Sequence, residues 1–301
     1  MTHEPAFDDE LWVIVGPTAS GKTELAIALS ELHGGEIVSA DSVQIYRHFQ
    51  VGTGKPNAAE RARARHHLID IVEPDEPMDA ARFAELAAEA IAQIRARGKR
   101  PIVCGGSFLW VKSLIFGLVP APPADPVVRA EHKAHVDREG RAGLHARLAA
   151  VDRESASRLS ENDFVRVSRA LEVFELTGKP MSVWQASHGF KVQERPARLF
   201  GVRREPGELD ARIEARCRLM FENGFIEEAR NLLERGYGDC RPFGSVGYKQ
   251  LRAALSSGRD LDVASLIGDV YRATRVFARR QRTWLRDQPV NWLEAGSTKL
   301  R

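Results

Sequence analysis

The sequence predicts an α/β protein in which helices cover both faces of a parallel sheet. Two observations carry this prediction. Short runs rich in Val and Ile alternate with segments whose apolar residues recur at helical spacing, which is the pattern of successive βαβ units. A long stretch with helical periodicity alone then interrupts the alternation, which indicates a helical insertion.

Five short apolar runs predict the strands of this sheet. They are Leu11–Val15, Glu36–Ser39, His67–Val72, Pro101–Cys104 and Leu199–Val202. Two amphipathic segments between them predict helices. Lys22–Leu32 has apolar residues at helical spacing, and Asp79–Arg97 has an apolar face and a stop signal at Gly98.

Proline marks the start of the insertion, with four prolines between residues 120 and 126. From Asp125 to His188 the periodicity is helical and no convincing strand occurs, and after the fifth strand we expect helices to the end. We therefore expect a catalytic core over 1–119, a helical insertion over 120–196, and over 197–301 the rest of the core with basic C-terminal helices.

The composition is that of a globular protein, since 43% of the 301 residues are hydrophobic and 28% are charged. The three cysteines, Cys104, Cys217 and Cys240, form no CxxC pair, so we expect free thiols rather than a zinc site or a disulfide framework. No signal peptide and no run of about 18 apolar residues occurs, so we expect a cytoplasmic protein with no membrane contact. We also expect the protein to be a monomer.

A phosphate-binding loop follows the first strand, because GPTASGKT matches the G-x-x-x-x-G-K-[ST] motif. Its backbone N–H groups and the start of the next helix favour phosphate oxygens, the lysine adds a positive charge, and the final hydroxyl suits Mg²⁺. A P-loop NTPase-like, nucleotide-binding core is thus predicted, although kinases, ATPases, GTPases and some transferases all use this loop. Its residues are Gly16, Pro17, Thr18, Ala19, Ser20, Gly21, Lys22 and Thr23.

Polar residues follow the other strands at the edge where α/β sheets bind ligands. Asp41, after the second strand, suits a Mg²⁺ ligand, a general base or a helix cap. Asp70 weakly resembles the acid of a Walker-B strand. Ser107, after Gly105-Gly106, is either a helix cap or a hydroxyl directed into the same cleft.

The net charge of +3 is the sum of two oppositely charged parts of the chain. Residues 241–301 contain 12 Lys and Arg against 5 Asp and Glu, a net charge of +7, whereas the other 240 residues carry −4. Five arginines within this segment fall on one helix face, opposite Val270, Ala273, Phe277 and Trp284. A stripe without acids favours a phosphate backbone over a merely solvated face. The stripe comprises Arg272, Arg275, Arg279, Arg282 and Arg286.

Several segments in order resemble one family, the IPP transferases, which are tRNA dimethylallyltransferases. Beside the phosphate loop these segments are SADSVQIY at 39–46, GTGKP at 52–56, HHLID at 66–70, GGS at 105–107, ND at 162–163, RALEV at 169–173, VGYK at 246–249, TR at 274–275 and RQRTW at 280–284. The resemblance runs from about Val13 to Trp284.

The resemblance implies a reaction, in which the dimethylallyl group of dimethylallyl diphosphate moves to the N6 amine of the adenine 3′-adjacent to the anticodon. It implies that Asp41 is the general base, that Lys22 and Thr23 act on the diphosphate with Mg²⁺, and that Ser107 stands at a position the family usually fills with Thr. Arg212 and Arg216 match a family pair near the diphosphate, although their alternative is a solvated face paired with Glu208.

The family also implies which residues contact tRNA. Val165, where a polar residue is common, and Gly244-Ser245, which lack large side chains, depart from the family's pattern. With the arginine stripe, the residues expected to contact tRNA are Asp41, Ser42, Val43, Gln44, Ser107, Asp125, Val165, Arg166, Val167, Ser168, Arg169, Gly244, Ser245, Val246, Gly247, Tyr248, Lys249, Arg275, Arg279 and Arg282.

Three other functions compete with this one. A small-molecule kinase would use Asp41 to activate a hydroxyl, but no arginine-rich lid segment is evident. A non-catalytic RNA-binding protein would not need Lys22, Thr23 and Asp41 together. Prenylation of a free adenine nucleotide, as in cytokinin synthases, would not need the long insertion or the basic C-terminal segment.

Overall fold

A computed structural model describes residues 10–190, 192–258 and 260–300. The chain divides into two compact units. Unit 1 comprises residues 1–116 and 193–301, and unit 2 comprises residues 117–192. No helix in the described ranges is both long and apolar enough to cross a membrane.

Unit 1 is built on a six-stranded, fully parallel sheet with the order β3-β2-β4-β1-β5-β6. Val15, at the end of β1, is paired with Gly105 on one side and Gly201 on the other, so these strands end at one edge of the sheet. The strands are β1 (Leu11–Val15), β2 (Gly35–Ser39), β3 (His66–His67), β4 (Arg100–Gly105), β5 (Ala197–Val202) and β6 (Val290–Leu293).

Two strand predictions need correction. The strand predicted over His67–Val72 is limited to β3, because Leu68 and Asp70 have positive φ angles of 61° and 58° that end the extended chain. β6 lies in a region predicted to be helical, where it pairs in parallel with β5. Its four residues are too few to show an alternating pattern.

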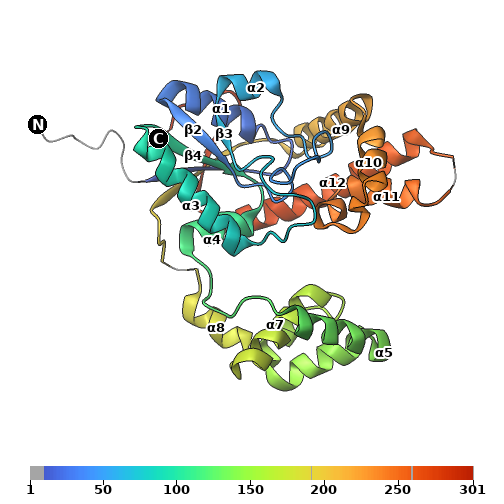
Figure 1. Ribbon diagram of the computed structural model, residues 1–301. Coiled ribbons are helices and arrows are strands. Elements are labelled where there is room, and N and C mark those ends of the chain that lie inside the picture. The colour runs from blue at the N-terminus through green and yellow to red at the C-terminus, as the bar shows by residue number, and fades with distance from the viewer. Residues whose placement is uncertain (1–9, 191, 259, 301) are drawn as a thin grey trace, which may run out of the picture. The chain divides into compact units, whose positions relative to one another are not determined.

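Helices cover both faces of the sheet, as predicted. In Figure 1, α1 (Lys22–His33) and α3 (Ala80–Ala96) lie on opposite sides of β2 and β4. Ile14, Ile37, Ile102 and Phe200 are buried together with Leu29 of α1. The short helices α2 (Ala58–Arg63) and α4 (Phe108–Phe116) complete this part of the unit.

The C-terminal helices of unit 1 stand beside the sheet in Figure 1. α9 (Pro206–Glu222) and α12 (Val263–Leu285) pack against each other through an apolar cluster that includes Ile213, Cys217 and Val270. α10 (Phe225–Glu234), the 3-10 turns at Tyr237–Asp239 and Arg241–Gly244, and α11 (Tyr248–Leu255) lie between them in the chain.

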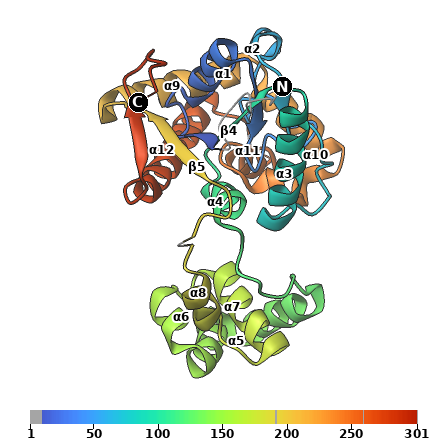
Figure 2. The ribbon, with the colours of Figure 1, turned by 90° about the vertical axis from the view of Figure 1, so that its left-hand side faces the viewer.

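As predicted, the regular elements among the described residues of unit 2 are all helices, namely α5 (Pro126–Val151), α6 (Arg153–Arg158), α7 (Phe164–Thr177) and α8 (Met181–His188). Figure 2 shows these helices packed together. Leu144, Leu148 and Leu171 belong to their core. Two buried carboxylates also hold the unit: Asp152 caps α6, and Glu172 accepts hydrogen bonds from Arg129 and Arg169.

Candidate active site

A cavity of about 370 Å³ lies at the sheet edge where β1, β2 and β4 end. Its walls come from the phosphate loop, the loops that follow β2 and β4, helices α9 and α12, and the segment before α11. The structure therefore brings together residues that are distant in sequence. Of the predicted site residues, those that line the cavity are Thr18, Lys22, Thr23, Asp41, Ser42, Val43, Gln44, Ser107, Arg216, Gly244, Ser245 and Val246.

The phosphate loop has the curled backbone that its motif predicts. Ala19 and Gly21 have φ angles of 63° and 94°, and α1 begins directly after the loop. Two guanidinium groups bind the loop's carbonyls: Arg204 Nε donates to Ser20 O at 3.1 Å, and Arg212 Nε donates to Ala19 O at 2.8 Å. These bonds fix the peptide planes, and with them the opposite N–H groups. Arg212 thus contacts the loop rather than Glu208.

Lys22 brings a half-buried positive charge to the cavity. Its Nζ donates to Pro17 O at 3.4 Å. Burial lowers the pKa of Lys22, while the negative charge of Asp41 acts in the opposite direction. Burial also raises the pKa of the Cys104 thiol to about 11, so this cysteine stays protonated at neutral pH. A desolvated ammonium group favours an anionic ligand beside it.

Asp41 lies in the loop directly after β2. Its Oδ1 accepts hydrogen bonds from the backbone N–H groups of Val43 at 2.9 Å and Gln44 at 3.2 Å. The capping interpretation therefore holds for one carboxylate oxygen, although the capped element is a turn and not a helix. Among the described residues, no hydrogen bond reaches Oδ2, which lies free to accept one from a ligand.

Ser107 supports this loop. Its Oγ accepts the N–H of Ser42 at 2.9 Å and donates to the hydroxyl of Ser42 at 3.0 Å. These bonds tie the loop after β4 to the residue next to Asp41. In this structure the Ser107 hydroxyl is a support for the Asp41 loop.

Residues 52–54 form another wall, which the sequence did not assign to the site. Gln44 Nε2 donates to the carbonyls of Thr53 at 3.3 Å and Gly54 at 3.1 Å, and Arg216 Nη2 donates to Thr53 O at 3.2 Å. The predicted pair of arginines is thus divided between two loops, with Arg216 in the cavity wall and Arg212 on the phosphate loop.

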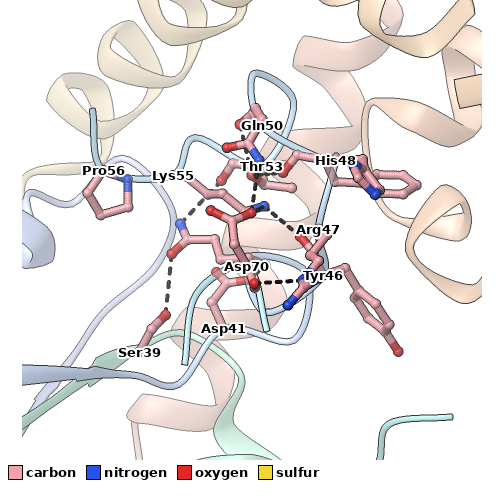
Figure 3. Close-up of polar contacts among 12 residues, drawn as sticks. Ser39, Asp41, Tyr46, Arg47, His48, Gln50, Thr53, Lys55, Pro56 and Asp70 are labelled. Atoms are coloured by element: carbon pink, nitrogen blue, oxygen red, sulfur yellow. Dashed lines mark hydrogen bonds and ion pairs between the residues drawn. The ribbon is translucent and has the colours of Figure 1, made fainter. Parts of the chain in front are cut away.

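Asp70 does not have the surroundings of a Walker-B acid. Figure 3 shows it beside Lys55 and Gln50, and its carboxylate accepts from Lys55 Nζ at 2.5 Å, from Gln50 at 2.8 Å and from Arg61 at 3.0 Å. These three groups belong to the segment 50–61, so Asp70 holds this segment in place. The interpretation of Asp70 as a Walker-B acid is therefore wrong.

Sequence reasoning also missed Gln281 of α12. Its side chain is 5% exposed, its Oε1 accepts the N–H of Thr18 at 2.8 Å, and its Nε2 donates to Gly106 O at 3.0 Å. It therefore joins the phosphate loop to the loop after β4. Its position on the buried face of α12, three residues after Ala278 and four before Leu285, was the available signal.

One side of the cavity is apolar. Cys217 and Met220 of α9 line it together with Val270 and Phe277 of α12. Phe277 is 40% exposed, so the apolar face predicted for α12 does not serve packing alone. The cavity thus combines an anion-binding end with a wall suited to a small hydrocarbon group.

Some residues expected to contact tRNA lie elsewhere in unit 1. Tyr248 is fully buried, and its hydroxyl donates to Glu228, so its side chain belongs to the core. Gly247 is buried with a φ of 95°, and Lys249 is exposed on α11.

The arginine stripe on α12 is not free of acids, contrary to its interpretation from the sequence. Arg272 pairs with Asp269 at 2.5 Å and Arg275 with Asp210 at 2.7 Å. The other three arginines of the stripe, Arg279, Arg282 and Arg286, line a second, open hollow of about 550 Å³. The residues of this hollow that bear charges or rings are Arg203, Arg204, Arg279, Arg282, Arg286 and Trp292.

The predicted residues of unit 2 fall into three groups. Val165, Arg166 and Arg169 line a hollow of about 220 Å³, and Val165 is 72% exposed. Val167 and Ser168 are buried. Asp125 caps α5 by accepting from the N–H groups of residues 127 and 128.

Mg²⁺ fits the donor set of the cavity only together with a ligand. No cluster of three His, Cys, Asp or Glu suited to a metal occurs in the part of the chain that the structure describes. The Thr23 hydroxyl and the Asp41 carboxylate do line the same cavity, and both are oxygen donors of the kind that Mg²⁺ prefers. Mg²⁺ commonly takes its other ligands from substrate phosphates and water.

Comparisons with known proteins agree on one family. The IPP transferase family matches residues 44–288. The chain is 61% identical over 292 residues to the tRNA dimethylallyltransferase of Sorangium cellulosum (strain So ce56), covering 97% of this chain and 92% of that protein. It is 45% identical over 296 residues to the tRNA dimethylallyltransferase of Geobacter sulfurreducens (strain ATCC 51573 / DSM 12127 / PCA), covering 98% and 94%.

Solved structures are similar as well. The tRNA isopentenylpyrophosphate transferase of Bacillus halodurans is 35% identical with a TM-score of 0.69, over 95% of this chain and 90% of that one. A eukaryotic dimethylallyltransferase acting on tRNA is 24% identical with a TM-score of 0.80, over 95% of this chain and 74% of that one, and supports the fold alone.

Proposed function

This chain belongs to the IPP transferase family, and on that premise we propose that it is a tRNA dimethylallyltransferase. It transfers the dimethylallyl group of dimethylallyl diphosphate to the N6 amine of the adenine 3′-adjacent to the anticodon. The products are N6-(dimethylallyl)adenosine in tRNA and diphosphate. A tRNA substrate implies action in the cytoplasm, and we expect the enzyme to act as a monomer.

The observation that carries this proposal is the composition of the cavity. Lys22 and Thr23 provide a site for phosphate oxygens, Asp41 provides a carboxylate, and Met220 and Phe277 belong to an apolar wall. A kinase needs the first two features, whereas transfer of a dimethylallyl group to an amine also needs an apolar surface for the hydrocarbon chain.

The residues have distinct roles in the transfer. A C–N bond forms between the N6 amine and the first carbon of the dimethylallyl group, while the bond from that carbon to the diphosphate oxygen breaks and its electron pair leaves with diphosphate. Lys22, Arg216 and the N–H groups of the phosphate loop stabilise this charge. Asp41 accepts the proton that the amine loses.

Mg²⁺ would be held by the Thr23 hydroxyl and diphosphate oxygens, with Asp41 within the same cavity. When bound, it supplies positive charge that favours the departure of diphosphate. Because the described residues alone do not build a closed metal site, we expect Mg²⁺ to bind together with the prenyl donor.

The adenine must leave its stack to reach the cavity, which costs a few kcal/mol. The loop from Ser42 to Gln44 and the segment Gly244–Val246 line the cavity where an extruded base would enter. Phosphate contacts would compensate this cost, and we assign them to Arg279 and Arg282, which line the open hollow of unit 1.

Incubation with labelled dimethylallyl diphosphate, Mg²⁺ and unmodified tRNA, followed by nucleoside analysis, tests the proposal. We expect label in N6-(dimethylallyl)adenosine at the position 3′-adjacent to the anticodon. A parallel reaction with ATP and small-molecule acceptors tests for a kinase. Sustained phosphate transfer without any prenylated adenosine would overturn the proposal, and label in free adenine nucleotide alone would reassign the acceptor.

A further inference from the structure

The cavity wall at residues 52–54 is continuous with a loop that is bound by a single carboxylate. The backbone N–H groups of Gln50, Val51 and Gly52 donate to the carboxylate of Glu228 in α10, at 3.0, 2.8 and 3.2 Å. Three successive N–H groups on one carboxylate form charge-assisted hydrogen bonds, which fix the course of the loop.

The same carboxylate reaches a second wall. The hydroxyl of Tyr248 donates to Glu228 Oε1 at 2.5 Å. Tyr248 lies two residues after the segment Gly244–Val246, which lines the same cavity as residues 52–54. Burial and the charge of Glu228 raise the pKa of Tyr248 well above its usual value, so the hydroxyl remains a donor at all working pH values.

The loop has little freedom to settle elsewhere. A Cβ at Gly52 would lie 2.1 Å from the ring of Phe225 and 2.5 Å from that of Tyr248, so the backbone rests directly on both rings. The next residue, Thr53, offers its carbonyl to Arg216 and Gln44. The position of the loop therefore sets the position of a guanidinium group in the cavity.

The loop is also held on its C-terminal side, at Lys55. Figure 3 shows Lys55 beside Tyr46 and Asp70, and Lys55 Nζ donates to Tyr46 O and to Asp70 at 2.5 Å each. A change at Glu228 thus leaves the loop attached at Lys55. We expect such a change to displace residues 50–53 rather than to unfold the unit.

We propose that Glu228 is a positioning residue of the transferase, which holds loop 50–53 against Tyr248 so that the Thr53 carbonyl directs Arg216 toward the diphosphate of the prenyl donor. This inference rests on the proposed function for the identity of the donor. Glu228 itself does not line the cavity, so it acts through the loop and through Arg216.

The test compares Glu228→Gln with Glu227→Gln. Glutamine keeps the size of the side chain but replaces one acceptor oxygen with an NH₂ group that faces backbone donors. Glu227 is the exposed neighbour on the same helix, and no ion pair involving it occurs among the described residues. For Glu228→Gln we expect the KM for dimethylallyl diphosphate to rise about tenfold or more, with the Kd for tRNA changed by less than about twofold. Glu227→Gln should match the wild type.

Two further measurements separate this role from a merely structural one. Amide hydrogen exchange at residues 50–52 should accelerate in Glu228→Gln, while exchange in β1 and β4 stays unchanged. Inorganic diphosphate with Mg²⁺, used as a binding probe, should bind more weakly. A lower Tm with an unchanged donor KM and unchanged diphosphate binding would overturn the proposal.

A variant that fails to fold does not end the test. Tyr248→Phe removes only the hydroxyl, so it should raise the donor KM by a smaller factor of about 2–5. An unchanged KM in this variant, with Glu228→Gln unfolded, would also overturn the inference. If the wild type makes no prenylated adenosine, the proposed function fails, and diphosphate binding with hydrogen exchange still decides whether Glu228 positions the loop.

Discussion

Asp41 is placed by hydrogen bonds that use only one of its carboxylate oxygens. Its Oδ1 accepts two backbone N–H groups, and the loop is supported by Ser107. We predict that Asp41→Asn keeps the turn, because the amide oxygen still accepts these bonds, but removes the proton acceptor. The rate of prenyl transfer should fall by about 10²–10⁴-fold, while the Kd for tRNA changes little.

Single-turnover rates with saturating tRNA measure this effect. Asp75→Asn, at an exposed carboxylate of the same unit, is the matched control and should keep the wild-type rate. Normal turnover by Asp41→Asn would refute its assignment as the general base.

Gly54 combines a left-handed backbone conformation with close contact to Arg216. Its φ is 58°, and an added Cβ would lie 2.0 Å from Arg216 Nη2. Gly54→Ala should therefore displace the guanidinium group and weaken the binding of dimethylallyl diphosphate by about tenfold or more. Gly98→Ala is the matched control, since Gly98 has a similar φ of 66° with no atom within 4 Å of the added Cβ.

Both variants should lose about 1 kcal/mol of folding free energy from the left-handed backbone. Titration of the donor in the presence of Mg²⁺ separates this shared cost from the loss of binding. Equal affinities in the two alanine variants would show that Arg216 does not contact the diphosphate.

The motifs predicted the residues that precede or follow strands more successfully than those that come from distant helices. Lys22, Thr23 and Asp41, which follow strands in the sequence, line the cavity as their positions predicted. Gln281 and Phe277 were missed as site residues, because only the packing of α12 brings them beside the phosphate loop and the cavity.

Helix α12 carries two kinds of arginine on one stripe. Arg272 and Arg275 have acidic partners, whereas Arg279 and Arg282 line the open hollow. We predict that Arg279→Gln combined with Arg282→Gln weakens tRNA binding and reduces the slope of log K against log salt by about 1–2. Filter binding of tRNA over a series of salt concentrations measures this slope.

Arg272→Gln is the control on the same helix face. Because Arg272 is already paired with Asp269, its loss should change the slope by much less. A slope that responds equally to Arg272→Gln and to the double variant would contradict the division of the stripe.

At the scale of elements, periodicity predicted the long helices and the buried strands. Leu11–Val15 was found with its exact bounds, and the helices over 22–32 and 79–97 were found to within one residue at each end. The predictions failed for strands of two and four residues. Pairing partners, not local pattern, create β3 and β6, since each exists only through its neighbours β2 and β5.

At the scale of the whole molecule, the stability of unit 2 depends on two buried carboxylates. Glu172 has a fully buried side chain bound by Arg129, Arg169 and the N–H of Asp125, and Asp152 accepts from Ser155 and Ser182. Burial alone would raise the pKa of both carboxyl groups, but these hydrogen bonds prevail and hold each pKa below its usual value.

These lowered pKa values predict acid-sensitive stability in unit 2. A carboxyl group whose pKa is depressed by folding stabilises the fold above its unfolded pKa of about 4, and this contribution is lost as the pH falls through the folded pKa. The free energy of unfolding should therefore decline from about pH 5 downward. Trp184, the one tryptophan in the sequence of residues 117–192, reports the transition by fluorescence.

Glu172→Gln provides the comparison for this prediction. At pH 7 it should cost about 1–3 kcal/mol, because Arg129 and Arg169 lose a charged partner but stay partly exposed. Its stability should then decline less steeply with acid than that of the wild type. Parallel curves for the two proteins would show that Glu172 does not titrate with unfolding.

The position of β1 between β4 and β5 has a consequence for synthesis on the ribosome. β1 and β4 are complete by Gly105, but β5 begins only at Ala197, after the whole of unit 2. At roughly 5–20 residues per second, the nascent chain exposes one edge of its central strand for several seconds. During that interval the helical unit is already synthesised, so a fault in its folding would prolong the exposure of an apolar strand edge to chaperones and to aggregation.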